Sequence, residues 1–102
     1  MLRRVGGFDW DVGNISKCQK HGVSVAEIEI LFGSTSLSIE PDLPNSKFED
    51  HFNAIGRITD GRSLFLVFTF RILKGVALIR PISARYMHKK EIDHYAQKNA
   101  KT

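Results

Sequence analysis

Three arginines in the second half of the chain, Arg71, Arg80 and Arg85, have the chemistry needed to bind a phosphate. A guanidinium presents paired N–H donors in one plane and keeps its charge, so it matches two phosphate oxygens at once. RNA can be cut without a metal ion because its own 2′-hydroxyl can attack the neighbouring phosphate, and arginines can stabilise the charge that develops in that attack. The alternative for each arginine is a structural ion pair with an acid, for which the candidates are Glu49, Asp50 and Glu91.

Cleavage by the 2′-hydroxyl also needs groups that accept and release a proton, a contribution of about 10²- to 10⁴-fold in rate. The chain offers four such titratable groups before the arginines, namely Lys20, His21, Glu49 and His51. A lone histidine is more often structural or simply exposed, and this alternative stays open for both histidines.

The sequence lacks the motifs of several other kinds of functional site. There is no glycine-rich phosphate loop, no CxxC or HExxH zinc motif and no GxSxG nucleophile elbow. His88 and His94 are six residues apart, a spacing that does not place them on one helical face as a metal pair. We therefore expect neither a metal ion nor another cofactor.

The balance of charge differs between the two halves of the chain. Residues 1–51 carry five Lys or Arg against eight Asp or Glu, a net charge of −3, whereas residues 52–102 carry ten against three, a net charge of +7. A basic surface attracts polyanions, and nucleic acid is the commonest polyanion that a small cytosolic protein meets. The alternative is a solvated basic face that only improves solubility.

Length and composition predict one globular domain over residues 1–102. A hydrophobic fraction of 42% and a charged fraction of 25% are ordinary for a chain that buries one core. The only cysteine, Cys18, cannot form an intramolecular disulfide and fits a small core position. With no hydrophobic leader and no apolar run longer than residues 64–70, we expect a cytoplasmic protein that does not enter a membrane.

Capping residues and periodicity predict an α+β fold. Asp11 is placed to cap a helix over residues 12–20, and Ser24 with Glu27 forms a capping box before a second helix that Gly33 ends. Four strands follow, and then an amphipathic helix over residues 88–99. We therefore expect two short N-terminal helices, a four-stranded antiparallel sheet with the helices packed on one face, and a C-terminal helix.

The four strands are predicted from alternation and turn residues. Residues 36–40 alternate polar and apolar side chains up to Pro41. Residues 54–59 and 62–71 flank Asp60-Gly61, a strong signal for a type I′ hairpin turn, in which both central residues have positive φ. The last strand, residues 76–84, follows Lys74-Gly75.

Hairpin register predicts which side chains share a face of the sheet. If Lys74-Gly75 is a two-residue turn, Thr69 lies opposite Arg80, and Arg71 points to the same side. The other side is apolar along both strands and suits packing against the helices.

A bulge extends the basic face. Pro81 cannot donate a hydrogen bond to a ladder, so it indicates an edge or a bulge. A bulge shifts the side-chain period by one residue and would bring Ser83 and Arg85 to the face of Arg80.

Several short motifs occur together and in order over residues 8–96. They are Phe8-x-Trp10-Asp11, Lys20-His21-Gly22-Val23-Ser24, Ile55-Gly56, Thr69-x-Arg71 and Arg80-x-Ile82-Ser83-Ala84-Arg85, followed by Glu91 and Tyr95. In this combination the chain resembles the BrnT family of bacterial toxins. It departs from the family pattern at His51, where an arginine is common, and in the longer, more acidic stretch of residues 41–51.

The resemblance implies a RelE-like fold and a metal-independent endoribonuclease that inhibits translation by cutting RNA. It also implies a protein antitoxin, encoded by an adjacent gene, that neutralises the toxin. Operator DNA would be bound only through the complex of the two proteins, in which the toxin is a co-repressor. Carried onto this chain, the resemblance implies catalytic roles for Lys20, Arg71, Arg85, His21 and Glu49 and a place for Arg80 in the same site. As RNA-binding residues we expect Arg80, Ser83, Arg57 and Lys89.

Two other functions stay open. A catalytically inactive binding module would use the basic face to dock an acidic antitoxin segment or a nucleic acid and would act as a transcriptional co-repressor. A DNA-binding regulator acting alone has less support, because no recognition-helix pattern is present. The lysines of the last helix either extend the RNA surface, belong to a detachable antitoxin face, or are only solvated.

Overall fold

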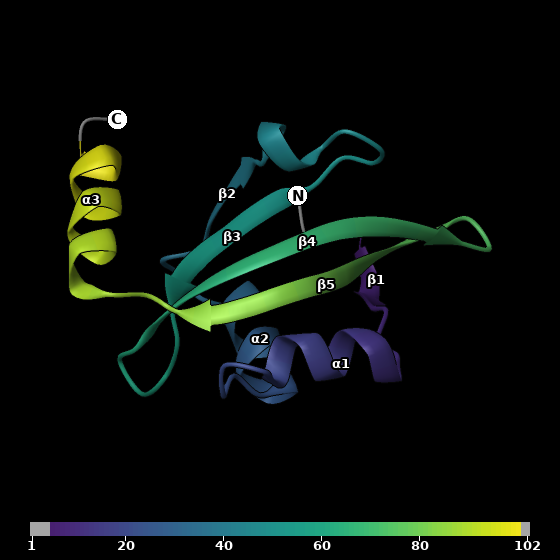
Figure 1. Ribbon diagram of the computed structural model, residues 1–102, viewed down its shortest axis with the longest axis horizontal. Coiled ribbons are helices and arrows are strands. Elements are labelled where there is room, and N and C mark those ends of the chain that lie inside the picture. The colour runs from purple at the N-terminus through teal and green to yellow at the C-terminus, as the bar shows by residue number, and fades with distance from the viewer. Residues whose placement is uncertain (1–4, 101–102) are drawn as a thin grey trace.

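The computed structural model describes residues 5–100, which form three α-helices, one short 3-10 helix and a five-stranded sheet. The sheet has the order β1-β5-β4-β3-β2, with β1 parallel to β5 and every other pair antiparallel. Figure 1 shows α1 and α2 together beneath the strands and α3 apart from them at one end of the sheet. The elements are β1 (Val5–Phe8), α1 (Val12–Gln19), α2 (Val25–Phe32), β2 (Ser38–Pro41), η2 (Leu43–Asn45), β3 (Phe52–Arg57), β4 (Ser63–Leu73), β5 (Val76–Tyr86) and α3 (Lys89–Ala100).

The α+β class is confirmed, but the prediction of a four-stranded antiparallel sheet was wrong. Strand β1 precedes the two helices expected at the N-terminus and makes the sheet five-stranded and mixed. Two of its four residues are glycines, so it has no alternating pattern, and its partner β5 lies far along the chain. Gly6 permits the close approach, because a Cβ there would clash with Cγ1 of Val76. The likeness to RelE stays a prediction.

The expected packing of all helices on one face was also wrong. Helices α1 and α2 cover one face of the sheet, whereas α3 meets side chains of the opposite face, where Glu91 binds Arg85. Only two residues separate Tyr86, the end of β5, from Lys89, the start of α3. This short connection fixes the start of α3 at the end of the sheet.

Both helix caps expected from the sequence are present. The Asp11 carboxylate accepts a hydrogen bond of 2.9 Å from the backbone N–H of Asn14, whose side chain accepts one from Asp11 in return. Ser24 and Glu27 form the same reciprocal pair at the start of α2, which ends at Gly33. These local bonds satisfy N–H groups that a helix start otherwise leaves free.

The core lies between α1, α2 and the face of the sheet that they cover. It is built from side chains of the helices, the turn between them and three strands, with aromatic rings at its centre. Cys18 is fully buried there, as expected from the sequence. Among the described residues, no helix combines the length and the apolar character needed to cross a membrane.

The two hairpin turns differ from each other. At Lys74-Gly75 both residues have positive φ, 51° and 81°, which is the two-residue type I′ geometry. At Asp60-Gly61 only the glycine has positive φ, so the predicted type I′ turn was wrong there. Instead, a longer loop is closed by a 2.9 Å bond from the N–H of Ile58 to the carbonyl of Arg62. The Asp60 carboxylate binds Arg62, which stabilises this alternative.

Candidate active site on the open face of the sheet

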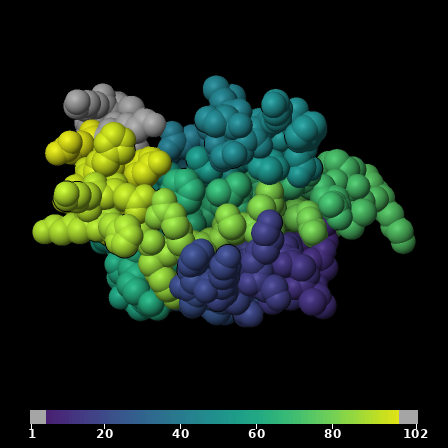
Figure 2. All heavy atoms as spheres, viewed as in Figure 1, coloured from purple at the N-terminus to yellow at the C-terminus, as the bar shows by residue number. Residues whose placement is uncertain are grey.

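The face of the sheet turned away from α1 and α2 carries the predicted arginines, and we call it the open face. Thr69 lies opposite Arg80, which confirms the predicted register. Arg71 is two residues from Thr69 along β4 and therefore has the same orientation. In Figure 2, side chains of β4 and β5 in green lie between α3 in yellow and the segment around η2 in teal.

The predicted bulge is present in β5. Val67 pairs with Ser83, but the next residue of β4, Phe68, pairs with Pro81, so Ile82 is the extra residue. Because of this shift, Ser83 and Arg85 point to the face of Arg80. Thr69 and Phe65, the partners of Arg80 and Arg85 on β4, are four positions apart, which corresponds to about 13 Å along the strand.

Arg71 and Arg80 form what we call the hairpin-side cluster, together with Asp9 and Asp11. Nη1 of Arg80 lies 3.2 Å from Oδ2 of Asp9, and its Nη2 lies 2.8 Å from Oδ2 of Asp11. Nη1 of Arg71 lies 3.5 Å from the same Asp9 oxygen. The side chain of Arg80 is 20% exposed and that of Arg71 is 49% exposed. Arg80 is therefore held by two carboxylates, whereas Arg71 keeps about half of its surface open to a ligand.

The charges of the hairpin-side cluster stabilise each other. Hydrogen bonding to Asp11 raises the pKa of Arg80, with a further contribution from the charges of Asp11 and Asp9. The pKa of Asp11 is lowered, first by the backbone N–H of Asn14 and then by Arg80. Asp11 thus joins the start of α1 to the arginines of the sheet.

Asp9 and Asp11 were missed by the sequence analysis, which considered only acids after residue 40 as partners of the arginines. The available signal was their spacing around Trp10, because residues two apart in an extended segment point to the same side. Nothing in that spacing indicates which distant side chain they meet.

Arg85 belongs to a second group, the helix-side cluster, with Glu91 and Phe65. Its Nη1 and Nη2 each donate a 2.7 Å hydrogen bond to one oxygen of Glu91, and its Cζ lies 4.6 Å from the centroid of the Phe65 ring. The bond to Glu91 raises the pKa of Arg85. The pKa of Glu91 falls to about 2, first through Arg85 and then through the backbone N–H of His88. The ion pair with Glu91 was the structural alternative left open by the sequence.

Glu49 and His51 come together at the corner of the open face next to Thr69. Nε2 of His51 lies 3.2 Å from Oε1 of Glu49, and the Thr69 hydroxyl donates a 2.7 Å bond to the carbonyl of Asp50. Continuing the β3–β4 register by one residue places His51 opposite Thr69, and hence in the row of Arg80. A histidine oriented by a carboxylate is suited to proton transfer.

Lys20 and His21 lie in the turn between α1 and α2. Both are exposed, and the Tyr86 hydroxyl donates a 3.3 Å bond to the Gly22 carbonyl, which places the turn beside the end of β5. Among the described residues, neither side chain forms a hydrogen bond or ion pair with the three arginines. Their catalytic roles stay predictions.

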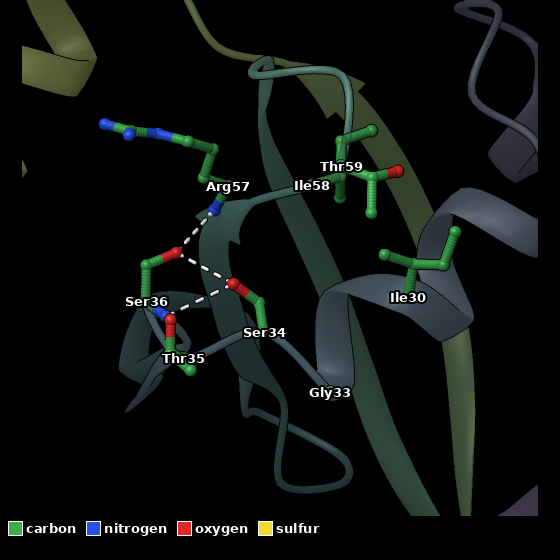
Figure 3. Close-up of a pocket in the computed structure, with 8 residues that line it drawn as sticks. All are labelled: Ile30, Gly33, Ser34, Thr35, Ser36, Arg57, Ile58 and Thr59. Carbon is green, nitrogen blue, oxygen red and sulfur yellow. Dashed lines mark hydrogen bonds between the residues drawn. The ribbon is translucent and has the colours of Figure 1, made fainter.

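The predicted RNA-binding residues are spread along the open face. Ser83 is half-buried between the two clusters, and Lys89 is exposed at the start of α3. Arg57 donates its backbone N–H to the Ser36 hydroxyl at 2.7 Å and borders a hollow of about 340 Å³. Figure 3 shows the guanidinium of Arg57 extending away from Ile30 on the opposite wall of this hollow. Their roles in binding RNA stay predictions.

A further network of contacts, around Arg62, stabilises the fold. The guanidinium of Arg62 lies 4.1 Å from the centroid of the Tyr86 ring and 3.0 Å from Glu27. The Tyr86 hydroxyl donates to Glu27, and burial, followed by this bond, raises the pKa of Tyr86. These contacts join α2 to the end of the β4–β5 hairpin on the helix-covered side.

Comparison with known protein families gives a match over most of the chain. A family model described as "Ribonuclease toxin, BrnT, of type II toxin-antitoxin system" matches residues 10–91, which include both clusters except Asp9. No curated protein matches the chain. In the described residues, no group of three or more His, Cys, Asp or Glu side chains is placed to hold a metal ion.

Proposed function

Because the chain belongs to the family of BrnT ribonuclease toxins of type II toxin-antitoxin systems, we propose that it is an endoribonuclease that inhibits translation by cutting RNA in the cytoplasm. The observation that carries the proposal is the open face, on which three arginines share one side of two paired strands. One of them, Arg71, is half exposed while a carboxylate still positions it.

RNA phosphates bind at the two ends of the open face. Arg71 binds the scissile phosphate and stabilises the charge that develops on it, while Arg80 fixes the position of Asp9 between the two guanidinium groups. Arg85 binds a second phosphate after its bonds to Glu91 are released or shared. Ser83 binds the RNA between these positions, and Arg57 and Lys89 bind it beyond Arg85, at the end of the sheet next to α3.

The reaction uses no metal ion in this proposal. His51, oriented by Glu49, removes the proton of the 2′-hydroxyl, and the 2′-oxygen forms a bond to phosphorus. The bond from phosphorus to the 5′-oxygen breaks, and this oxygen takes a proton from solvent water, because Lys20 and His21 lie beside the end of β5, beyond Arg85 and away from Arg71. The products are one RNA fragment ending in a 2′,3′-cyclic phosphate and another beginning with a 5′-hydroxyl.

The partners follow from the family. A protein antitoxin encoded by the adjacent gene neutralises the enzyme, and operator DNA is bound only by the complex of the two proteins. The net charge of +7 in residues 52–102 supports binding of RNA and of acidic protein segments alike.

The test is cleavage of a defined RNA by the purified protein in the presence of a chelator. We expect fragments with cyclic phosphate and 5′-hydroxyl ends from the wild-type protein and from Lys17→Ala, a control that removes an exposed charge on α1. Arg71→Ala should remain folded and lose the activity. An intact RNA pool with folded wild-type protein would contradict the proposal.

One observation favours a second candidate function, a binding module without catalysis. Each of the three arginines already has a carboxylate partner within the chain. In that case the open face is a charged docking surface, and the protein acts as a co-repressor with its antitoxin. Unchanged RNA together with binding of operator DNA by the two proteins would support this function.

A further inference from the structure

The β4–β5 hairpin has an unpaired edge. The last pair between β3 and β4 is Phe52 with Phe68, but β4 continues to Leu73. From Thr69 onward, β4 pairs with β5 alone in the described part of the chain. Figure 1 shows the hairpin extending past the start of β3. This edge therefore presents backbone groups that another strand can bind.

The register identifies these backbone groups. Leu73 and Val76 flank the two-residue turn and exchange hydrogen bonds with each other. Because hydrogen-bonded and non-bonded pairs alternate along antiparallel strands, the N–H and C=O of Phe70 and Ile72 point away from β5. The edge thus offers two donors and two acceptors with the spacing of a β-ladder.

The side chains along this edge alternate in character. Phe70 and Ile72 lie on the face covered elsewhere by α1 and α2, but the eight-residue helices span only about 12 Å, against about 36 Å for eleven residues of β4. Ile72 consequently remains 64% exposed. Between these two residues, Arg71 points to the open face with half of its side chain accessible. A strand added at this edge therefore meets apolar, basic and apolar side chains in turn.

We propose that this edge binds an extended segment of the antitoxin with the pattern apolar, acidic, apolar. The segment adds a strand to β4 at Phe70 and Ile72 and covers their side chains with its own apolar residues. Its acidic residue pairs with Arg71, the arginine that the proposed function assigns to the scissile phosphate. The inference rests on the antitoxin partner of that proposal and supplies the means of neutralisation.

Charge argues against a second copy of this chain at the same edge. In an isologous pair of edges each Arg71 would lie close to the Arg71 of the other copy, and like charges on neighbouring strands are destabilising. An acidic residue opposite Arg71 would replace this repulsion with an attraction. A hollow of about 260 Å³ beside Phe70, lined also by Phe52, Thr69, Glu49 and Asp50, adds space for a side chain of the incoming segment.

Ile72→Pro tests the backbone contact. Proline removes the outward N–H of residue 72 and leaves the β4–β5 hydrogen bonds intact, because Ile72 and Ala77 are a non-bonded pair. The probe is the purified product of the adjacent gene, with its Kd measured by titration calorimetry. We expect Ile72→Pro to weaken binding at least about tenfold, and Ile72→Val, which keeps the N–H, to change it by less than about threefold. RNA cleavage by both variants should equal that of the wild type.

Hydrogen exchange of the wild-type protein gives a readout that does not depend on the folding of a variant. The amides of Phe70 and Ile72 should exchange more slowly when the antitoxin is bound. Unprotected amides, or an unchanged Kd for folded Ile72→Pro, would overturn the inference. So would a dimer of the free chain that Ile72→Pro dissociates, since the edge would then bind a second copy. If the edge binds the antitoxin but the wild type cuts no RNA, only the proposed catalytic function fails.

Discussion

The two arginine clusters of the open face use the same type of side chain in different ways. In the hairpin-side cluster, the Asp9 carboxylate is shared by Arg71 and Arg80, and Asp11 adds a second bond to Arg80 alone. In the helix-side cluster, both oxygens of Glu91 are committed to Arg85. The first arrangement holds Arg71 through one contact of 3.5 Å, and the second holds Arg85 through two hydrogen bonds of 2.7 Å to a carboxylate of α3.

The two arginines differ in how tightly they are held and hardly in exposure, since the side chain of Arg71 is 49% exposed and that of Arg85 is 41% exposed. Arg71 can bind a phosphate without breaking a strong contact, because its distance to Asp9 is 3.5 Å and half of its side chain is exposed. Arg85 must first exchange two 2.7 Å bonds to Glu91. We therefore expect the hairpin side to dominate catalysis and the helix side to modulate it.

The largest expected effect is that of Arg71→Ala on cleavage. Loss of a donor that stabilises transition-state charge reduces kcat by about 10²- to 10³-fold. Arg71→Lys should recover part of the rate, since it keeps the charge but not the paired donors. The comparison is made by single-turnover cleavage of a defined RNA. Equal rates for Arg71→Ala and the wild type would remove the contrast between the two clusters.

Arg80→Ala should act mainly on stability. Its removal leaves Asp9 and Asp11 without their main cationic partner, and Arg80 is only 20% exposed, so we expect a loss on the order of 1–3 kcal/mol in the free energy of unfolding. Urea denaturation measures this quantity, with Lys17→Ala as the control for loss of a surface charge. A cleavage defect without any loss of stability would instead give Arg80 a role in the reaction.

A smaller effect is expected from opening the helix-side cluster. Glu91→Gln removes the charge that holds Arg85, which should increase RNA affinity by up to about fivefold, because a partly exposed ion pair contributes ~0–1 kcal/mol. Asp93→Asn, on the same helix, is the matched control. Filter binding with uncleavable RNA measures the change. Weaker binding by Glu91→Gln would mean that Glu91 positions Arg85 for RNA instead of competing with RNA for it.

The pH dependence of the same ion pair should be the smallest effect. The folded pKa of Glu91 is lowered from 4.5 to about 2, so its stabilisation is present above about pH 4.5 and is lost as the pH falls toward about 2. The stability advantage of the wild type over Glu91→Gln should shrink across this interval, as measured by urea denaturation at several pH values. An advantage that does not change between pH 5 and pH 2.5 would contradict the assignment.

Much of the open face was predictable because short-range rules decide it. The two-residue turn at Lys74-Gly75 sets the register of β4 and β5, and Pro81 locates the bulge that turns Arg85 to the face of Arg80. The same reasoning failed at Asp60-Gly61, where bonds within a longer loop replaced the expected turn. Local signals identify candidate turns, and the contacts around each one decide its geometry.

The sequence by itself determined the helix caps, the alternation of the strands and the shared face of the arginines, because each depends on neighbours along the chain or across one turn. Only the tertiary structure decided that β1 joins the sheet, that Asp9 and Asp11 hold Arg80, and that Glu91 of α3 pairs with Arg85. These contacts join segments that are distant in the sequence. They come together because a common core is buried or because one segment follows the end of a strand. No local pattern encodes such a pairing, since its free energy arises only once the distant surfaces meet.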